Sequence, residues 1–336
     1  MDIICSIGPK IHTLNHIKDY YEAGMTMARF NFSHVDYEKF GYLIEGIKNN
    51  YSNVSIIQDL QGNKIRVSKS FGKEKKIYKG EKAIFCLENR FQSLLDNPKL
   101  NYKIIPIFYE GNLADFKYVK YIFMKDATMR FQVIKKTNNY ILTLTESGGI
   151  IRGEKGINAP GLIRSDLKLT NKDKEDIKFG IEKGVDVICL SYVTSSNNMV
   201  ELKKYLQSLN TNTDNIKLWA KIECKEAILN FNNILEECDG IMLGRGDLKG
   251  EVPISKIPSI ENKIISKMKR DSKPLIIGTY VLDSMSKSEI PSIAEVNDIY
   301  RYFLNKVDGL MLSTELTVSN NPIRIVKSLC NLLKKF

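Results

Sequence analysis

Charged side chains follow two short apolar runs in the middle of the sequence, where the strands of a parallel sheet would end. Lys221 and Glu223 lie at the end of the first run, and Arg245 and Asp247 follow the second. Glu223 and Asp247 are hard oxygen ligands of the kind that hold Mg²⁺ together with a substrate phosphate. Lys221 precedes Glu223 by two residues, so in a strand both side chains point to the same side, and the ammonium can stabilise charge that develops beside the metal. The spacing therefore predicts a metal-dependent site for an anionic substrate.

The residues between these charges add a second feature. Gly244, Arg245 and Gly246 offer consecutive backbone N–H groups, two of them on residues without a Cβ atom, which predicts an anion-binding nest. The same stretch also fits a buried pair of strands with two surface salt bridges. That alternative stays open on the residues alone.

Alternating strand and helix patterns must position these side chains. Outside one insert, eight apolar runs alternate with eight helical patterns, and each run ends in polar or turn residues. The predicted strands cover residues 3–7, 25–31, 54–57, 185–190, 217–222, 240–243, 274–277 and 309–312. This is the inventory of a TIM (β/α)8 barrel, an α/β fold whose active site lies at the mouth where the strands end. A doubly wound open sheet is the alternative, but no GxGxxG motif follows the first strand.

The alternation stops after the third strand. Short alternating runs separated by turn-like residues dominate residues 67–154, which predicts a small all-β domain, itself a barrel. Thr170 and Asp173 match a capping box that opens the next barrel helix. We therefore expect a TIM barrel made of residues 1–66 and 155–336, with residues 67–154 inserted as a β-rich lid.

Composition excludes several classes of protein. The chain has 336 residues, 43% of them hydrophobic, and it has no apolar run of eighteen residues, so no transmembrane helix is expected. The first residues lead directly into strand-like sequence, so no leader peptide is expected. Six scattered cysteines without zinc-like spacing favour free thiols in a reducing cytoplasm. The net charge of +11 comes mainly from lysines spread over amphipathic helices, which favours solvated faces over nucleic-acid or membrane binding.

Ten stretches resemble, in the same order, the motifs of the pyruvate kinase family: ICSIGPK, AGMTMARFNFSH, DLQGNKIRV, KGINAPG, LTNKDKEDIKFGIEKGVD, KIECKEAILNFNNILEECDGIM, RGDL, KPLIIGTYVLDSM, AEVND and DGLMLSTE. The resemblance covers nearly the whole chain. It implies a Mg²⁺- or Mn²⁺-dependent phosphotransferase that moves a phosphoryl group between phosphoenolpyruvate and ADP. It also implies that the insert is the family's mobile B domain.

The resemblance also bears on the expected oligomeric state. The family's C-terminal domain, which usually carries effector binding and subunit contacts, is expected to be absent because Phe336 closes the eighth barrel helix. A monomer or a barrel-mediated homodimer is therefore expected.

Roles for individual residues follow from the same resemblance. Arg29 would contact the transferring phosphoryl group, and Lys221 would stabilise the transition state and the enolate. Glu223 and Asp247 would bind the divalent metal. The residues that would hold the substrate are Arg29, Lys221, Asp247, the backbone around Gly246 and the side chain of Thr279. Ser313 and Glu315 match the family's proton-delivery network. Such a set suits phosphoryl transfer, where catalysis is mostly positioning and electrostatic stabilisation.

The resemblance also implies which residues would bind the nucleotide and a monovalent cation. Arg66 and Lys155, at the two ends of the insert, match the family's ATP contacts, and Asn31 borders the nucleotide. The monovalent-cation corner would comprise Asn31, Ser33, Asp59 and the backbone of Leu60.

Potassium dependence has a signature of its own. Potassium-independent members carry Leu, Gln and Lys where this chain has Leu60, Gln61 and Lys64. We predict activity without K⁺, with the ammonium of Lys64 supplying the positive charge.

Several of these residues also have simpler interpretations. His34 fits an ordinary polar loop residue, and Ser33 and Thr279 fit helix N-caps. Arg66 fits a pairing with a surface acid. For Lys221, Glu223 and Asp247 together, a purely structural interpretation is harder, because it must explain why charged residues occur at the ends of adjacent strands.

Departures from the family pattern cluster near the expected substrate. The departing positions are Asn63, Thr194, Cys224, Gly244, Lys249, Gly250, Tyr280, Thr314 and Leu316. We expect the phosphoryl chemistry to be intact and hypothesise a changed acceptor preference. The alternatives are a kinase of another small hydroxy or keto acid, a metal–enolate lyase or aldolase, and a non-catalytic regulatory homologue. Retention of Arg66, Lys155 and the whole insert argues against the lyase.

Overall fold

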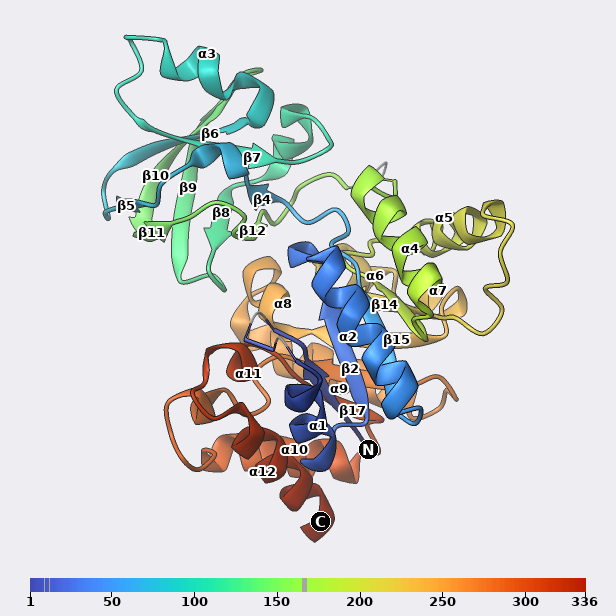
Figure 1. Ribbon diagram of the computed structural model, residues 1–336. Coiled ribbons are helices and arrows are strands. Elements are labelled where there is room, and N and C mark those ends of the chain that lie inside the picture. The colour runs from blue at the N-terminus through green and yellow to red at the C-terminus, as the bar shows by residue number, and fades with distance from the viewer. Residues whose placement is uncertain (9, 12, 165–167) are drawn as a thin grey trace. The chain divides into compact units, whose positions relative to one another are not determined.

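The described residues form two compact units. The computed structural model describes residues 1–8, 10, 11, 13–164 and 168–336. The first unit comprises residues 1–62, 169–246 and 257–336, and the second comprises residues 63–168 and 247–256 (Figure 1).

A closed barrel of parallel strands forms the centre of the first unit, as the alternating pattern predicts. Within the described part of the chain its eight strands follow the order β1-β17-β16-β15-β14-β13-β3-β2. They are β1 (Asp2–Ser6), β2 (Met27–Asn31), β3 (Ser55–Asp59), β13 (Val187–Leu190), β14 (Lys217–Ile222), β15 (Gly240–Gly244), β16 (Leu275–Gly278) and β17 (Gly309–Leu312). The predicted TIM barrel is confirmed.

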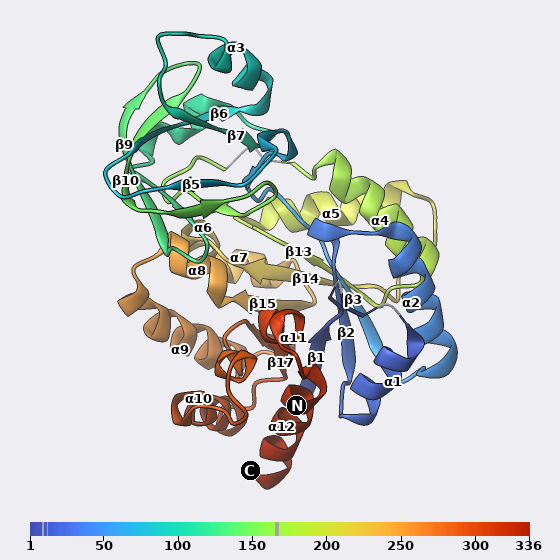
Figure 2. The same ribbon diagram turned by 60° about the vertical axis from the view of Figure 1, so that its left-hand side comes forward.

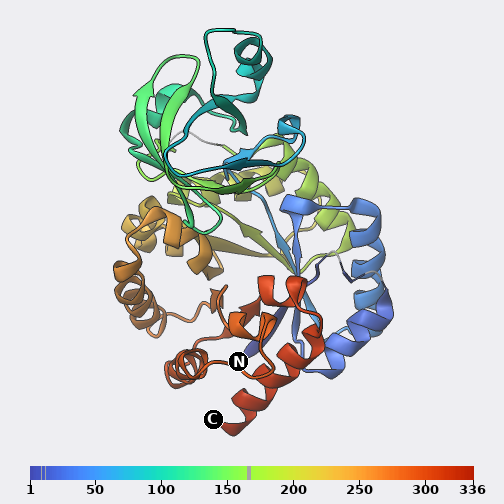
Figure 3. The ribbon, with the colours of Figure 1, turned by 90° about the vertical axis from the view of Figure 1, so that its left-hand side faces the viewer.

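Helices surround this barrel (Figure 3). They are α1 (Leu14–Glu22), α2 (Tyr37–Asn50), α4 (Asn171–Lys183), α5 (Ser196–Ser208), α6 (Lys225–Leu229), α7 (Phe231–Glu236), α9 (Ile257–Met268), α10 (Ile293–Leu304), α11 (Thr314–Val318) and α12 (Pro322–Lys335). The predicted capping box opens α4, because Thr170 Oγ1 accepts from the N–H of Asp173 and the Asp173 carboxylate accepts from the N–H of Thr170. The last helix, α12, packs beside β1 and so completes the ring (Figure 2).

Apolar side chains fill the barrel interior. All eight strands contribute to one buried cluster, which contains Ile4, Met27, Ile57, Val187, Cys189, Trp219, Met242, Ile276 and Met311. Below the mouth the barrel is therefore a packed core, and polar chemistry is confined to the strand ends.

A glycine fixes the chain direction where β3 ends. Gly62 has a φ of +60°, and a Cβ atom there would lie 2.1 Å from the carbonyl oxygen of Ser191. Its N–H donates to Asp173 Oδ1 at 3.0 Å. A side chain at this position would meet both backbone strain and a collision, so the turn after β3 requires glycine.

The second unit is built mainly of antiparallel strands. Seven strands of its described residues form a sheet in the order β12-β8-β9-β10-β6-β7-β4, and β11 pairs separately with β5. The strands are β4 (Arg66–Val67), β5 (Lys75–Ile77), β6 (Lys82–Leu87), β7 (Lys103–Phe108), β8 (Tyr121–Met124), β9 (Met129–Lys136), β10 (Ile141–Ser147), β11 (Gly149–Ile151) and β12 (Ile157–Asn158). A short helix that the sequence patterns do not predict, α3 (Phe91–Leu95), is also present.

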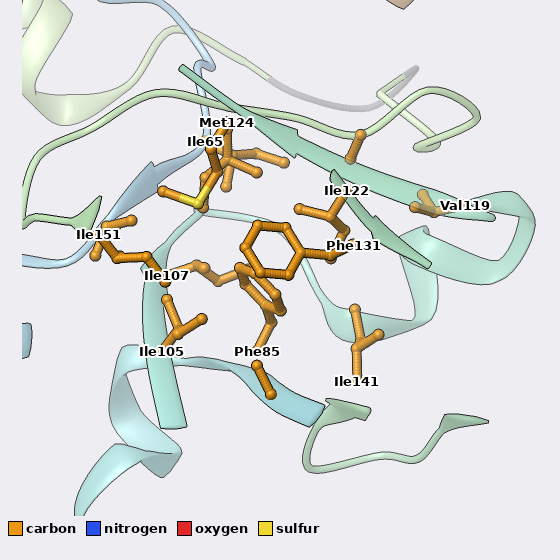
Figure 4. Close-up of a cluster of buried hydrophobic side chains, with 14 of the residues drawn as sticks. Ile65, Phe85, Ile105, Ile107, Val119, Ile122, Met124, Phe131, Ile141 and Ile151 are labelled. Carbon is orange, nitrogen blue, oxygen red and sulfur yellow. The ribbon is translucent and has the colours of Figure 1, made fainter. Parts of the chain in front are cut away.

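The two end strands of this sheet are themselves joined. The N–H of Ile157 donates to Ile65 O and the N–H of Val67 donates to Lys155 O, both at 2.9 Å, and Arg66 forms a bridge with Gly156. The sheet thus curls back on itself around an apolar core, in which the rings of Phe85 and Phe131 meet edge to face at 5.2 Å (Figure 4). Because β4 and β12 belong to this sheet, the second unit extends beyond the predicted limits of residues 67–154.

One short helix connects the units along the chain. Helix α8 (Arg245–Glu251) starts directly after β15, with its first two residues in the first unit and the remainder in the second. The sequence patterns do not predict this helix, because it spans only seven residues and contains two glycines.

Candidate active site

The carboxyl ends of the barrel strands present most of the predicted site residues. Parallel strands that close a barrel end at the same mouth, so their terminal side chains gather there. These residues are Arg29 on β2, Asp59 on β3, Lys221 and Glu223 at the end of β14, Thr279 after β16, and Ser313 and Glu315 after β17.

Asp59 binds two cationic side chains. Arg29 donates to its Oδ2 from Nε at 2.8 Å and from Nη2 at 2.5 Å, and Lys221 Nζ lies 3.1 Å from the same oxygen. Ser191 Oγ donates to Oδ1 at 3.0 Å, and Arg29 Nη1 donates to Ser6 Oγ at 2.9 Å. Asp59 is 1% exposed and Arg29 is 8% exposed. The arrangement fixes the two cations for which the resemblance implies roles, Arg29 at the phosphoryl group and Lys221 at the transition state and the enolate.

Opposite charges set the protonation states in this cluster. Burial alone would raise the pKa of Asp59, but the nearby Lys221 and Arg29 lower it below its usual value. Burial alone would lower the pKa of Lys221, but Asp59 and Glu223 raise it above its usual value. Asp59 therefore stays a carboxylate and Lys221 stays an ammonium over the physiological range.

Glu223 is buried and held on two sides. Its Oε1 lies 3.2 Å from Lys221 Nζ, and its Oε2 accepts from the N–H of Tyr192 at 3.1 Å. Tyr192 has a φ of +54°, an unusual conformation that aims its N–H at the carboxylate. A Cβ atom on Gly244 would lie 2.7 Å from Glu223 Cγ. Glycine at this departing position thus leaves room for the glutamate side chain.

Thr279 occupies a strained turn after β16. Thr279 and Tyr280 have φ values of +67° and +54°, and a β-branched residue is rare in this region. The Thr279 hydroxyl accepts from the N–H of Gly246 at 2.9 Å and donates to Gly278 O at 2.6 Å. Its hydroxyl bonds are therefore made within the turn and to the start of α8, which rules out the simpler helix N-cap interpretation.

The predicted anion nest is wrong. None of Gly244, Arg245 and Gly246 has a positive φ among the described residues, so the alternation that a nest requires does not form. The chain enters helix α8 at Arg245 instead, and the N–H of Gly246 donates to Thr279.

The side chain of Arg245 holds the Thr279 turn. Its Nε donates to Thr279 O at 3.0 Å, and its Nη2 donates to the same oxygen. Its Nη1 donates to the hydroxyl of Tyr302 at 2.7 Å, and that hydroxyl donates to Glu261 Oε1 at 2.8 Å. Arg301 also pairs with Glu261. Helices α9 and α10 are thus linked through this network to the residue predicted to bind the substrate carboxylate.

Ser313 and Glu315 form a buried pair at the end of β17. Glu315 Oε2 accepts from the N–H of Ser313 at 2.9 Å. Glu315 Oε1 and Ser313 Oγ have no hydrogen-bond partner within the described chain. Burial raises the pKa of Glu315, and the backbone N–H groups of Ser313 and Leu282 oppose that shift. A carboxyl with these properties favours its protonated form and is suited to proton delivery.

In the predicted monovalent-cation corner, the side-chain oxygens of Asn31 and Asp59 already accept hydrogen bonds from other groups of the protein. Asn31 Oδ1 accepts from the N–H of Ser33 at 3.1 Å and caps the short 3₁₀ turn Phe32–His34. Ser33 therefore lies inside that turn and is not its cap. Asp59, as described above, is bound by Arg29, Lys221 and Ser191. Leu60 is buried, and its N–H donates to Cys189 O at 2.9 Å.

In the second unit, Lys64 binds Asp247. Lys64 Nζ lies 2.8 Å from Oδ1 and 2.7 Å from Oδ2 of the carboxylate. The side-chain amide of Asn158 donates to Asp247 O at 3.3 Å and to Oδ1 at 3.4 Å. Each of the two predicted metal ligands, Glu223 and Asp247, is thus in contact with a lysine ammonium.

A buried ion pair anchors the end of α8. Arg164 Nη2 lies 2.9 Å from Glu251 Oε1, and both side chains are 1% exposed. A Cβ atom on Gly250 would lie 2.6 Å from Cγ of Asn158. The departure to glycine at this position therefore makes room for an asparagine that contacts Asp247.

The predicted nucleotide contacts are also in the second unit. Arg66 Nη1 donates to Glu154 O at 2.7 Å, and Lys155 is exposed. Arg66 thus binds a backbone carbonyl of the same unit.

Sequence reasoning misses four residues that hold predicted site residues within their own unit or link to them. Ser191 directly follows β13, so the signal of a polar residue at a strand end points to it as it does to Lys221. Tyr302, Glu261 and Asn158 have no such signal, because their partners are distant in the sequence.

Among the described helices, none is both long enough and apolar enough to cross a lipid bilayer.

Comparison with known proteins adds an independent finding. The family model "Pyruvate kinase, barrel domain" matches residues 1–326. The chain is 31% identical to a pyruvate kinase of Bacillus licheniformis over 99% of its length and 32% identical to one of Geobacillus stearothermophilus over 97%. It is 33% identical to a pyruvate kinase of Thermococcus litoralis over 99% of its length. The chain spans 56%, 55% and 68% of these relatives, so it corresponds to about half of the first two.

Proposed function

Because the chain belongs to the pyruvate kinase family, we propose that it moves a phosphoryl group between phosphoenolpyruvate and ADP, yielding pyruvate and ATP. The observation that carries the proposal is the buried cluster in which Arg29 and Lys221 are fixed by Asp59. Two cations held rigidly at a barrel mouth suit a substrate whose phosphoryl and carboxylate groups are both anionic.

The residues of the chain contribute to catalysis by holding the substrate and by placing positive charge where negative charge develops. Arg29 binds the transferring phosphoryl group, since Asp59 keeps its guanidinium in one orientation. Lys221 stabilises the enolate oxygen that forms when the phosphoryl group leaves, and its raised pKa keeps it charged throughout. Thr279 orients the substrate carboxylate with the backbone at Gly246, once its hydroxyl has exchanged the bond to Gly278 O for one to the substrate. Arg29 and Lys221 are preorganised by Asp59, so little rearrangement of these two groups is needed in the transition state.

Proton delivery is assigned to the buried pair after β17. Conversion of the enolate to pyruvate requires a proton at carbon. Burial raises the pKa of Glu315 and so shifts it toward its protonated form, and its Oε2 accepts from the backbone N–H of Ser313. We assign to this pair the transfer of that proton into the substrate site.

The chemistry of the donor set fits a divalent metal. Glu223 and Asp247 are carboxylates that each bind an ammonium, so both positions favour positive charge. These two residues would hold Mg²⁺ or Mn²⁺, which when bound neutralises the phosphoryl and carboxylate oxygens of the substrate. The proposal requires no further protein ligand, since substrate oxygens complete such sites.

The nucleotide and monovalent-cation assignments are also proposals. Asn31, Arg66 and Lys155 would contact the nucleotide, and the inserted β-rich domain would act as its lid. Asn31, Ser33, Asp59 and Leu60 would form the cation corner, with the ammonium of Lys64 replacing K⁺. The proposed location is the cytoplasm, and the proposed assembly is a monomer or a barrel-mediated homodimer.

One observation favours a second candidate, a kinase of another small hydroxy or keto acid. Gly244 lets the Glu223 side chain occupy space that a Cβ atom would fill, and this alters the surroundings of a proposed metal ligand. Cys224, another departing position, is buried next to Glu223 in the sequence. Turnover of pyruvate equal to that of an ordinary pyruvate kinase would exclude this candidate.

Phosphoenolpyruvate-dependent ATP formation from ADP tests the proposal directly. The assay contains Mg²⁺ and no K⁺ and compares the native protein with Lys221→Met. We expect turnover in the native protein and none above background in the variant. Lack of ATP in both, with both proteins folded, would contradict the proposal and lead to assays of other small acids in the reverse direction.

A further inference from the structure

Lys64 and Asp247 form a close contact within the second unit. The ammonium lies 2.7 Å and 2.8 Å from the two carboxylate oxygens, so it is at hydrogen-bond distance from both at once. The side chains are 18% and 17% exposed. Shielding of this degree weakens water's competition for the pair, and the contact is therefore stronger than an ordinary surface salt bridge.

Neighbouring residues are shaped to this contact. A Cβ atom on Gly156 would lie 2.6 Å from Lys64 Cε, so glycine there gives the lysine stem its path. Asn158, 3% exposed, donates its amide to the same carboxylate, and Gly250 leaves room for that asparagine. Asp247 is thus surrounded by donors that hold its carboxylate in one position.

The oxygens that contact Lys64 are those that a metal would need. An ammonium at hydrogen-bond distance from both oxygens and a divalent cation at coordination distance cannot share the same side of one carboxylate, because two cations would then be in contact. We propose that Lys64 is an internal competitor for the divalent cation at Asp247. This inference rests on the proposed function only in taking Asp247 as a metal ligand.

Two consequences follow for the protein. Lys64 weakens the binding of the divalent metal, since its contact with Asp247 must break first. Metal binding also releases a charged side chain on the segment that follows β3. A partly buried ion pair of this kind lowers metal affinity by about fivefold.

Binding of Mn²⁺ alone, without substrate or nucleotide, tests the competition. Free Mn²⁺ is measured by electron paramagnetic resonance in titrations of the native protein and of Lys64→Met, whose side chain has similar length and no charge. We expect the Kd of Mn²⁺ to fall about fivefold in the variant. Lys64→Gln, which keeps a hydrogen-bond donor without charge, is expected to give a smaller fall.

Lys103→Met is the matched control. Lys103 belongs to the same unit and pairs with Glu81 at 2.6 Å, so this change removes an equal charge and an equal type of contact. Its Mn²⁺ affinity is expected to stay within about twofold of native. Asp247→Asn identifies the ligand, since it should weaken Mn²⁺ binding in the presence and absence of Lys64. Thermal unfolding with and without Mn²⁺ shows whether each variant is folded.

The outcomes separate the inference from the proposed function. Mn²⁺ binding that is equal or weaker in folded Lys64→Met overturns the inference, even when the native protein forms ATP. A Kd for Mn²⁺ that is unchanged in Asp247→Asn also overturns the inference. Tighter binding in Lys64→Met alone supports it, even when no ATP forms from phosphoenolpyruvate and the proposed function fails.

Discussion

Arg29 and Asp59 form a two-point ion pair between neighbouring strands of the barrel, in which one guanidinium donates twice to one carboxylate oxygen. The pair sits at the end of a packed apolar interior, where water is scarce. This geometry makes Asp59 a positioning residue: it orients the guanidinium of Arg29, which we propose binds the phosphoryl group of the substrate.

Replacement of Asp59 by Asn is expected to destabilise the protein by about 3–5 kcal/mol, because it leaves Arg29 and Lys221 buried without their shared carboxylate. Urea unfolding measures this loss. The pKa of Asp59 is lowered on folding, so its contribution is present above the usual value of 3.8 and is lost as the pH falls through the folded pKa. Glu237→Gln, which breaks an exposed pair with Lys203, is the control and should leave stability nearly unchanged. Equal effects of the two changes would contradict the assigned role.

Replacement of Glu315 by Gln is expected to change how stability depends on pH. Folding raises the pKa of Glu315, so its favourable contribution is complete below the usual value of 4.5 and is lost as the pH rises through the folded pKa. Native protein should therefore lose stability relative to the Gln variant as the pH rises above 4.5 and through the folded pKa of Glu315. Unfolding curves at several pH values test this, with exposed Glu45→Gln as control. A constant difference between native and variant across this range would refute it.

Removal of the Tyr302 hydroxyl is expected to weaken substrate binding from a distance. Tyr302→Phe deprives Arg245 of one acceptor and loosens its hold on the Thr279 turn. The KM for phosphoenolpyruvate should rise about tenfold, with a smaller change in kcat. Tyr300→Phe, an exposed position on the same helix, serves as the comparison. If kcat falls and KM is unaffected, Arg245 does not act through substrate positioning.

Activity is expected to be independent of K⁺. The ammonium of Lys64, which we propose replaces K⁺, supplies positive charge on the segment after β3, and Asp59 is already bound by two cations. Initial rates in KCl and in tetramethylammonium chloride of equal ionic strength should agree within about twofold. Strong activation by KCl alone would show that the corner requires a monovalent ion.

The sequence predicts the barrel well, because its strands are apolar runs with polar ends. Lys217–Ile222 and Gly309–Leu312 are predicted to the residue, and most other strands shift by one or two positions. Short elements such as α3 and α8 escape prediction, since fewer than two helical turns give no clear period. Boundaries of the inserted domain also differ, because two-residue strands such as β4 and β12 are recognised only by their partners.

Side-chain partnerships are harder to predict than strand ends. Lys221 and Glu223 can be found from spacing along one strand, but the contact of Lys221 with Asp59 reaches across β13 and depends on barrel closure. The link from Arg245 through Tyr302 to Glu261 joins three helices, and no local pattern marks it. The predicted nest failed for a related reason, since glycine content alone does not specify φ.

Helix α8 owes its order to its two ends. Arg245 is fixed to the Thr279 turn in the first unit, and Glu251 is fixed to Arg164 in the second. Gly246 and Gly250 each cost about 1 kcal/mol of helix propensity relative to alanine. Loosening of either anchor therefore frees the same seven residues, so amide hydrogen exchange in this one segment reports local unfolding in both units.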